Sequence, residues 1–410
     1  MRSESWIQDV LNETSASVET PISWIWWSLV SAISASAVDY QVISFNGNVT
    51  YKPNIYVVLY GDSGLGKAFG INLAKLLVQE ANITRVIAGR SSVQGIVKEI
   101  ATARSRENAA PFTDARCFVV NGELSSALVT DTEALSILTD LYDGAVNEKW
   151  DVLLKGEGLT KTNKPYMVNL FGSSQAHFQD KIPQANIEGG YVGRNLIIYE
   201  QNRARYIDPF GDNDETTSRI KDYIIPTFST HLSAIGKGSG TLILNSPAKS
   251  LYNSWRKKWR QNQQPDKTGF LNRVPDHVVK VSICLALSRY NNTDLIINEF
   301  DITEAIERVT SLVHTAKQVS VGQGPDPLAV GSRFVINQLL AAEGNCLRYK
   351  LLLSRGLGIY QSEGLQKVLD TLIEMGWARK ERIGVGSNSE WMVYLDGEPL
   401  KSLMESREKK

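Results

Sequence analysis

Short apolar runs separated by amphipathic stretches dominate the first half of the chain. Four runs have the length and the β-branched or aromatic content of buried strands: residues 56–60, 117–121, 166–171 and 196–199. The stretch after the first run repeats apolar residues at helical spacing, from Ile71 to Leu77. Strands that alternate with helices in this way predict an α/β fold.

Two further patterns precede the first of these strands. Residues 4–39 read as two helices with a break near Pro21. The apolar stretch 22–38 is interrupted by five serines and is short for a membrane span, so we expect a buried helix and no membrane contact. Residues 42–51 carry an Asn-Gly pair between β-prone flanks, which is typical of a hairpin.

The second half of the chain is rich in helical patterns. They run through residues 220–317 and include the most basic cluster of the sequence, Trp255–Arg260. That cluster either binds a phosphate backbone or forms an ordinary exposed helix face. A Gly- and Pro-rich segment at 322–327 then marks a linker.

The region after the linker has the pattern of a small separate unit. Three helices and two strands are expected there: 332–342, 347–354, 361–375, 378–382 and 391–395. Three helices with a two-stranded wing are typical of a winged helix. Gln366 and Lys367 lie on the third helix and are candidate DNA contacts, although winged helices also bind proteins.

Composition narrows the class of protein. A chain of 410 residues is expected to form two or three domains, and its 42% hydrophobic content is ordinary for a globular protein. Three widely separated cysteines suit a reducing cytoplasm. The formal net charge is zero, so contact with nucleic acid depends on local patches. The polar opening Met1–Asn12 predicts no secretory signal.

A glycine-rich loop joins the strand at 56–60 to the helix that follows. Strand, loop and helix in this order predict a phosphate-binding loop, with ATP as the expected ligand. The glycines allow successive N–H groups to face one anion, and Lys67 reaches the outer phosphates. The alternative is a chance match in a surface loop. The candidate nucleotide-binding residues are Gly61, Asp62, Ser63, Gly64, Leu65, Gly66, Lys67 and Ala68.

Two positions depart from the pattern that holds Mg²⁺. Ala68 follows the lysine, where a Ser or Thr hydroxyl normally ligates the metal. The strand at 117–121 runs into Gly122 and Glu123, where acids commonly hold the metal shell and polarise the attacking water. Glu123 fits the water-activating role, or it is an ordinary acid at a helix start. No side chain is assigned as a metal ligand, and the positioning of Mg²⁺ is in doubt.

Other candidates follow the later strands. Ser173, Ser174 and Gln175 end the strand at 166–171 and are placed to sense the γ-phosphate, or else to cap a helix. Arg194 precedes the next strand and is a candidate to reach a neighbouring subunit's nucleotide; the alternative is a surface salt bridge. Arg273 opens an apolar helix and is a candidate second arginine.

A projecting hairpin is expected between residues 143 and 164. Its basic residues are expected either to contact a nucleic-acid backbone or to belong to a solvated loop in which nearby acids dilute the positive charge. The candidate DNA-binding residues there are Lys149, Lys155, Lys161 and Lys164.

These motifs, in this order, resemble AAA+-type helicase ATPases of phages, plasmids and other mobile elements, near the minichromosome-maintenance helicases. The carriers are YKPNIYVVLYGDSGLGKAFGINLAKLL, FVVNGELSSAL, MVNLFGSSQ, GGYVGRNLIIYE and the RVPDHVVKVS helix, with the winged helix behind them. The resemblance implies a ring, commonly a hexamer, with each nucleotide held between subunits. It assigns Ser173 or Ser174 to sensor one, Arg194 to the arginine finger and Arg273 to sensor two. The hairpin would face a central DNA channel, and priming would need a primase partner.

The expected architecture is therefore a P-loop NTPase core, AAA+-like, between an N-terminal helical segment and a C-terminal winged helix. Six segments follow: helices and hairpin at 1–50, core at 51–210, helical lid at 211–321, linker at 322–329, winged helix at 330–396 and charged tail at 397–410. The expected function is a DNA-dependent ATPase motor, a replicative helicase of a mobile element. The alternatives are a nucleotide-switched ring or filament that loads or recruits other factors on DNA, and an inactive scaffold.

Overall fold

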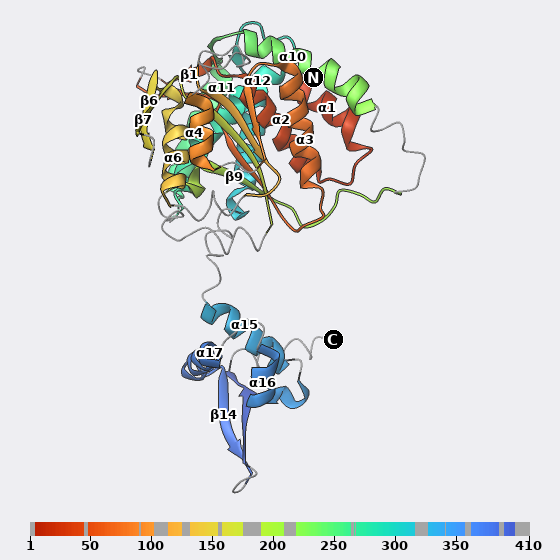
Figure 1. Ribbon diagram of the computed structural model, residues 1–410, viewed down its shortest axis with the longest axis vertical. Coiled ribbons are helices and arrows are strands. Elements are labelled where there is room, and N and C mark those ends of the chain that lie inside the picture. Colours follow the sequence, from red (N-terminus) through yellow and green to blue (C-terminus); the bar gives the residue numbers. More distant parts are fainter. Residues whose placement is uncertain are drawn as a thin grey trace. The chain divides into compact units, whose positions relative to one another are not determined.

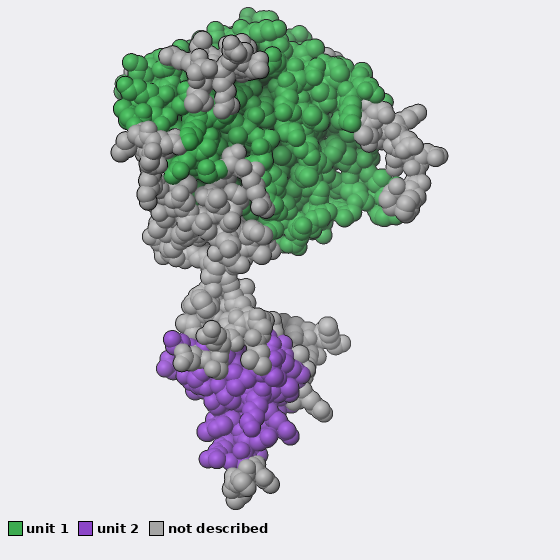
Figure 2. Space-filling model, viewed as in Figure 1, with its two compact units in different colours: residues 1–320 green, residues 321–410 purple. Residues whose placement is uncertain are grey.

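The structure is a computed structural model that divides into two compact units, residues 1–320 and 321–410 (Figure 2). We call them the first and the second unit. The residues that the structure describes are 5–44, 48–89, 92–101, 114–124, 132–154, 158–174, 190–208, 219–263, 266, 268–315, 327–340, 342–356, 362–384 and 389–397.

A five-stranded parallel sheet forms the centre of the first unit, which makes the fold a mixed α/β fold. Its order is β4-β5-β8-β3-β9, and every neighbouring pair is parallel. The bounds are β3 Tyr56–Tyr60, β4 Arg85–Ala88, β5 Arg116–Asn121, β8 Tyr166–Ser173 and β9 Asn195–Tyr199. All residues of β3 and β8 are buried, as expected for parallel strands covered on both faces.

Helices cover both faces of this sheet (Figure 1), and alternate residues of β3 belong to two different apolar cores. Val57 and Leu59 of β3 belong to the core formed with α1, α2, α3, α10 and α12. Tyr56, Val58 and Tyr60 face the other side, toward α4 and α6. The bounds are α1 Trp6–Ser15, α2 Ile22–Ser36, α3 Lys67–Ala81, α4 Val93–Ala101, α6 Thr132–Asp143, α10 Ile225–Lys237 and α12 Phe270–Ser288.

Short strands tie the N-terminal segment to the later part of the first unit. β1 (Tyr40–Ile43) pairs antiparallel with β2 (Thr50–Tyr51), as the hairpin pattern predicted, and parallel with β10 (Gly240–Thr241). The sequence predicted no strand in the helix-rich region, so the pairing of residue 40 with residue 240 is a correction. Strands of two residues carry too little periodicity to be recognised from sequence.

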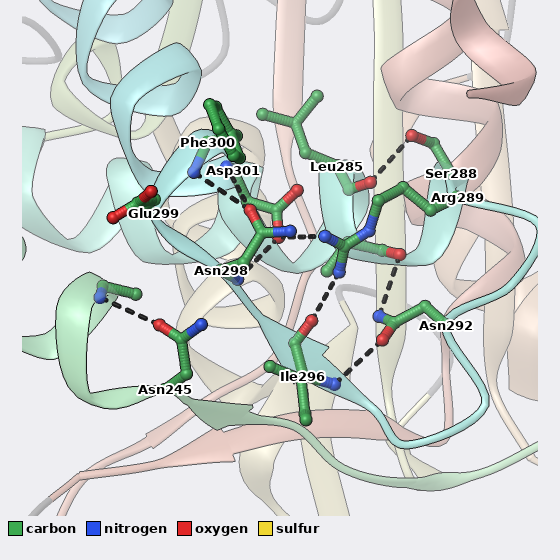
Figure 3. Close-up of polar contacts among 12 residues, drawn as sticks. Asn245, Leu285, Ser288, Arg289, Asn292, Ile296, Asn298, Glu299, Phe300 and Asp301 are labelled. Atoms are coloured by element: carbon green, nitrogen blue, oxygen red, sulfur yellow. Dashed lines mark hydrogen bonds and ion pairs between the residues drawn. The ribbon is translucent and has the colours of Figure 1, made fainter. Parts of the chain in front are cut away.

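A polar network joins the end of α12 to the start of α13 (Figure 3). α11 (Ser246–Gln261) follows β11 (Ile243–Leu244), and α13 (Glu299–Ser311) follows β12 (Ile296–Ile297), with β11 and β12 paired in parallel. Asn298 and Asp301 form a reciprocal capping box at the start of α13. Arg289, from the end of α12, forms an ion pair with Asp301 at 3.1 Å; Asp301 is buried and the Arg289 side chain is 11% exposed.

The remaining elements of the first unit are short. β6 (Lys149–Leu154) and β7 (Gly158–Asn163) form the antiparallel hairpin expected from the sequence. Two 3₁₀ turns cover Gly144–Val146 and Val192–Arg194, and a π-helical turn, Ile220–Ile224, precedes α10. In the described ranges, none of the helices combines the length and the apolar character needed to cross a bilayer. The three tryptophans of α2 are at most 2% exposed, as expected for a buried helix.

The described residues of the second unit form three helices beside a three-stranded antiparallel sheet in the order β13-β15-β14. The bounds are α15 Pro327–Leu340, a 3₁₀ turn Glu343–Asn345, β13 Cys346–Arg348, α16 Tyr349–Gly356, α17 Ser362–Glu374, β14 Ala378–Ile383 and β15 Glu390–Leu395. Two predictions need correction. Residues 327–329 of the expected linker are helical, and residues 346–348 form a strand before the second helix, because they pair with β15.

Candidate functional site

The glycine-rich loop lies at the carboxyl end of β3, between β8 and β9. In parallel sheets, ligands bind outside this end of the strands. Gly64 and Gly66 have φ values of 86° and 90°, which favour glycine. A Cβ atom on Gly66 would lie 2.6 Å from Thr20 Oγ1, and one on Gly61 would lie 2.4 Å from the Glu200 carbonyl oxygen. The loop therefore needs glycine for its backbone conformation and for its close contacts.

Lys67 is enclosed by the loop that precedes it. Its Nζ donates hydrogen bonds to the carbonyl oxygens of Gly61 at 2.7 Å and Asp62 at 2.9 Å. The same atom lies 5.6 Å from the centre of the Trp24 ring, and the residue is only 7% exposed. Burial lowers the pKa of the Lys67 ammonium, and the nearby carboxylates of Glu123 and Asp62 oppose this shift. The site therefore holds a desolvated positive charge at the start of α3.

The N-terminal helices support the loop from outside the sheet. Thr20 Oγ1 donates to the Gly66 carbonyl at 3.1 Å, and the Trp24 indole donates to the Ile198 carbonyl at 3.0 Å. A Cβ atom on Gly70 would lie 2.7 Å from Ser28 Oγ, so α2 and α3 pack closely. Sequence reasoning missed these supporting residues, because no local pattern links residue 20 to residue 66.

Arg203 is a second cation at the loop, also missed from the sequence. Its guanidinium donates to the Gly64 carbonyl at 3.2 Å and forms an ion pair with Glu19. The side chain is 52% exposed. Glu19 in turn accepts a hydrogen bond from the Ile207 N–H at 3.0 Å. The segment after β9 is therefore tied both to the loop tip and to the N-terminal segment.

The ends of β8 and β5 complete the site. The Gly61 N–H donates to the Ser173 carbonyl at 3.2 Å, which brings Ser174 beside the loop. Ser173 itself is fully buried, and its Oγ donates to the Ser174 carbonyl at 3.3 Å. Glu123 is exposed at the end of β5, and its N–H donates to Asn121 Oδ1 at 3.1 Å. Gln175 lies outside the described residues.

The two positions that lack an oxygen ligand have room for one. Ala68 is exposed on the first turn of α3. A Cβ atom on Gly122 would meet nothing within 4 Å. By contrast, a Cβ atom on Gly172 would lie 2.3 Å from the Gly122 carbonyl oxygen, because the ends of β5 and β8 are in close contact. The absence of oxygen at 68 and 122 is therefore not imposed by crowding.

The two candidate arginines lie together, away from the loop. Arg194 immediately precedes Asn195, which pairs with Tyr56 at the amino end of β3. The loop begins at the carboxyl end of β3, so the two places are about 18 Å apart along the strands at about 3.3 Å per residue. Arg194 cannot serve the loop of its own chain from this position.

Arg194 and Arg273 both lie within electrostatic reach of Asp143. The Arg194 guanidinium forms an ion pair with Asp143 and donates to the Gly190 carbonyl at 2.8 Å. Arg273 donates to the Gly269 carbonyl at 3.4 Å. Burial, followed by the neighbouring Arg194 charge, lowers the pKa of Arg273. The Arg194 side chain is 8% exposed and the Asp143 side chain is 55% exposed, so the ion pair is buried at the arginine and open to solvent at the carboxylate.

A buried lysine lies behind these arginines. Lys280 Nζ donates to Asn54 Oδ1 at 2.7 Å and to the Asn54 carbonyl at 3.1 Å. It also lies 3.8 Å from the centre of the Tyr142 ring. Burial lowers the pKa of Lys280 to about 7, and Asp276 opposes the shift. This residue was not a sequence candidate, because an apolar helical pattern does not reveal which polar position faces inward.

The hairpin lysines are exposed, but acids accompany them. Lys161 on β7 is directly opposite Asp151 on β6. Lys164 lies 3.9 Å from Glu148 as an exposed ion pair. Lys149 is exposed at the start of β6, and Lys155 lies outside the described residues. The hairpin therefore carries mixed charge rather than a strong basic stripe.

In the second unit, the Gln366 amide is engaged internally. Its Oε1 accepts from the Tyr349 hydroxyl at 2.9 Å and from Lys380 Nζ at 3.2 Å, and its Nε2 donates to Asp370 at 2.6 Å. Lys367 is exposed on α17. Lys367 is therefore the more accessible of the two candidate DNA contacts on this helix.

Comparison with known proteins adds no family assignment, since no protein-family model and no curated protein matches the chain.

Proposed function

We propose that the chain binds a nucleoside triphosphate, ATP, at loop residues 61–68. The observation that carries the proposal is the enclosed Lys67 ammonium, held by two loop carbonyls at the carboxyl end of a central parallel strand. Backbone N–H groups at the start of a helix and a desolvated ammonium favour a phosphate. As part of the same proposal, this region is a phosphate-binding loop in an AAA+-like core, and the second unit is a winged helix.

The residues present fit a triphosphate better than they fit a metal ion. Lys67 supplies positive charge, whereas positions 68 and 122 supply no oxygen. The carboxylates of Glu123 and Asp62 act on the Lys67 ammonium and raise its pKa against the effect of burial. When bound, Mg²⁺ would neutralise charge on the outer phosphates, and Glu123 would orient and deprotonate a water molecule.

For the assembly we propose a ring of copies, commonly a hexamer, that moves along DNA as a replicative helicase of a mobile element. The separation of about 18 Å between Arg194 and the loop of its own chain supports an arginine that acts across a subunit boundary. Such a role requires Arg194 to exchange Asp143 for a phosphate of the neighbouring subunit. Lys149, Lys161 and Lys164 on the hairpin and Lys367 on α17 are the proposed DNA contacts. Priming would be supplied by a primase partner.

A second candidate is an ATP-switched ring that hydrolyses slowly and recruits replication or recombination factors on DNA. Ala68 and Gly122 favour it, because a site without these oxygens binds the nucleotide more easily than it positions the metal.

Nucleotide binding is tested with a fluorescent ATP analogue. Replacing Lys67 with Ala should weaken binding about tenfold or more, because a charge-assisted contact is worth about 1.5–3 kcal/mol. Lys75→Ala, on the same helix, is the matched control and should bind as the unmodified protein does. If the unmodified protein has no affinity for any nucleoside triphosphate, with or without Mg²⁺, both candidate functions are rejected.

Turnover separates the two candidates. Hydrolysis that single-stranded DNA stimulates, and that Lys67→Ala abolishes, identifies the motor. Tight binding without turnover, together with hydrolysis gained in Ala68→Ser or Gly122→Asp, identifies the switch. Both substitutions have space in the structure.

The arginine is tested by mixing subunits. Arg194→Ala should retain nucleotide affinity as a monomer but lose turnover in the ring. Addition of Lys67→Ala subunits should restore part of the activity, because each variant supplies the group that the other lacks. No recovery at any mixing ratio would contradict a role across the interface.

A further inference from the structure

Helix α11 carries a concentrated positive charge. Among its residues Ser246–Gln261 there is no acid. Its basic residues are Lys249, Arg256, Lys257, Lys258 and Arg260. All of these except Arg256 are exposed, in a chain whose net charge is zero. A local positive field of this kind attracts phosphate groups.

An aromatic row runs along the same helix. Trp255 and Trp259 are stacked, with ring centres 5.7 Å apart and planes at 28°. Tyr252 continues the row at 5.9 Å from Trp255. The Trp259 indole donates to the Leu271 carbonyl at 3.1 Å, which fixes its orientation. Both tryptophans are half-buried and packed against the core, whereas Tyr252 is buried, so the accessible part of the row is the Trp255–Trp259 pair.

A cavity of about 430 Å³ borders both indole rings. Its polar lining comes from Lys258, Asn262 and Gln263. Two aliphatic side chains, Leu271 and Val313, complete the lining that the described residues provide, and none of these described residues is an acid. Pockets of about 300–1,000 Å³ that combine apolar walls with a few polar groups are typical of small-ligand sites. The Asn262 amide and the Gln263 amide oxygen can face the edge of a base, while Gln263 Nε2 donates to Asn272 Oδ1.

We propose that this surface of α11 binds single-stranded nucleic acid. One base stacks on the Trp255–Trp259 pair within the cavity, and Lys257, Lys258 and Arg260 contact the flanking phosphates. Stacking on aromatic rings beside a basic groove is how single strands are bound without sequence preference. A duplex fits less well, because its bases are already stacked on one another. The site extends the proposed function by giving it a strand contact, but it requires no nucleotide.

The test uses the full chain without ATP and a fluorescent thymidine 20-mer. Trp255→Leu should weaken binding about five- to a hundredfold, since stacking is worth about 1–3 kcal/mol per base. Lys258→Gln, an exposed change, should reduce the slope of log affinity against log salt by about 0.7. Lys221→Gln, an exposed lysine outside the helix, is the matched control and should change neither.

Cross-linking locates the contact independently of stability. A 20-mer containing 5-iododeoxyuridine should cross-link on irradiation to the peptide with Trp255 and Trp259. Cross-links confined to other peptides, or an unchanged affinity in both α11 variants, would overturn the proposal. Equal binding of an abasic oligomer would also overturn it. Lys67→Ala should bind the oligomer normally, so failure of the ATP site and failure of this site give different results.

Discussion

Lys280 should make the stability of the first unit depend on pH above neutrality. The side chain is 8% exposed, and its ammonium is held by Asn54 and covered by the Tyr142 ring. Burial lowers its pKa to about 7 from the ordinary 10.5. Between these values the unfolded chain binds more protons than the folded chain. The contribution of Lys280 to stability therefore rises with pH over this window and is constant below it.

The size of the effect follows from the two pKa values. One pKa unit corresponds to about 1.36 kcal/mol, so the full difference is about 5 kcal/mol. About 2 kcal/mol of it should appear between pH 7 and pH 9, where the folded lysine loses its proton. Lys280→Met keeps the aliphatic stem but removes the charge, so it should remove this part of the pH dependence.

The assay is urea unfolding followed by tryptophan fluorescence at pH 6, 7, 8 and 9. This signal reports mainly on the first unit, because only Trp377 and Trp391 of the nine tryptophans lie outside it. The free energy of unfolding of the unmodified protein, minus that of Lys280→Met, should rise by about 2 kcal/mol from pH 7 to pH 9. Lys221→Met, an exposed control, should follow the unmodified protein at a constant offset. Parallel curves for Lys280→Met would refute a depressed lysine pKa.

Three further predictions concern the packing and charges around the sheet and α13. Gly172→Ala should lower the free energy of unfolding in urea by about 1–3 kcal/mol, because its Cβ would lie 2.3 Å from the Gly122 carbonyl oxygen. Gly122→Ala is the control: its Cβ has open space, so it should change stability by less than about 0.5 kcal/mol. Burial raises the pKa of Asp301 to about 6 from 3.8, so its contribution to stability is full well below pH 3.8 and is lost as pH rises through 6. Relative to Asp301→Asn, the unmodified protein should lose about 2 kcal/mol between pH 4 and pH 7 in urea unfolding, and a constant difference would contradict this. Asp143→Asn should lower stability by about 1–3 kcal/mol in thermal unfolding, because the buried Arg194 loses its counter-charge. Adding Arg194→Met to this variant should recover most of the lost stability, and no recovery would show that the loss has another origin.

The amino-acid sequence determined much of the local structure. The apolar runs identified the central strands closely, and the strand at 56–60 has the same bounds in sequence and structure. The Asn-Gly signal predicted the β1–β2 pair, and the glycine-rich loop was located between β3 and α3. These features depend on side-chain periodicity and on backbone conformations open to glycine, which are properties of neighbouring residues.

Only the tertiary structure decided which distant groups meet. It brought Thr20 and Trp24 to the glycine-rich loop, and it buried Lys280 against Asn54. It also placed Arg194 at the opposite end of the sheet from the loop, beside Asp143. Strand order and side-chain partners depend on packing between segments that are tens to hundreds of residues apart. Periodicity shows that a residue is buried, but it does not show which residue will lie against it.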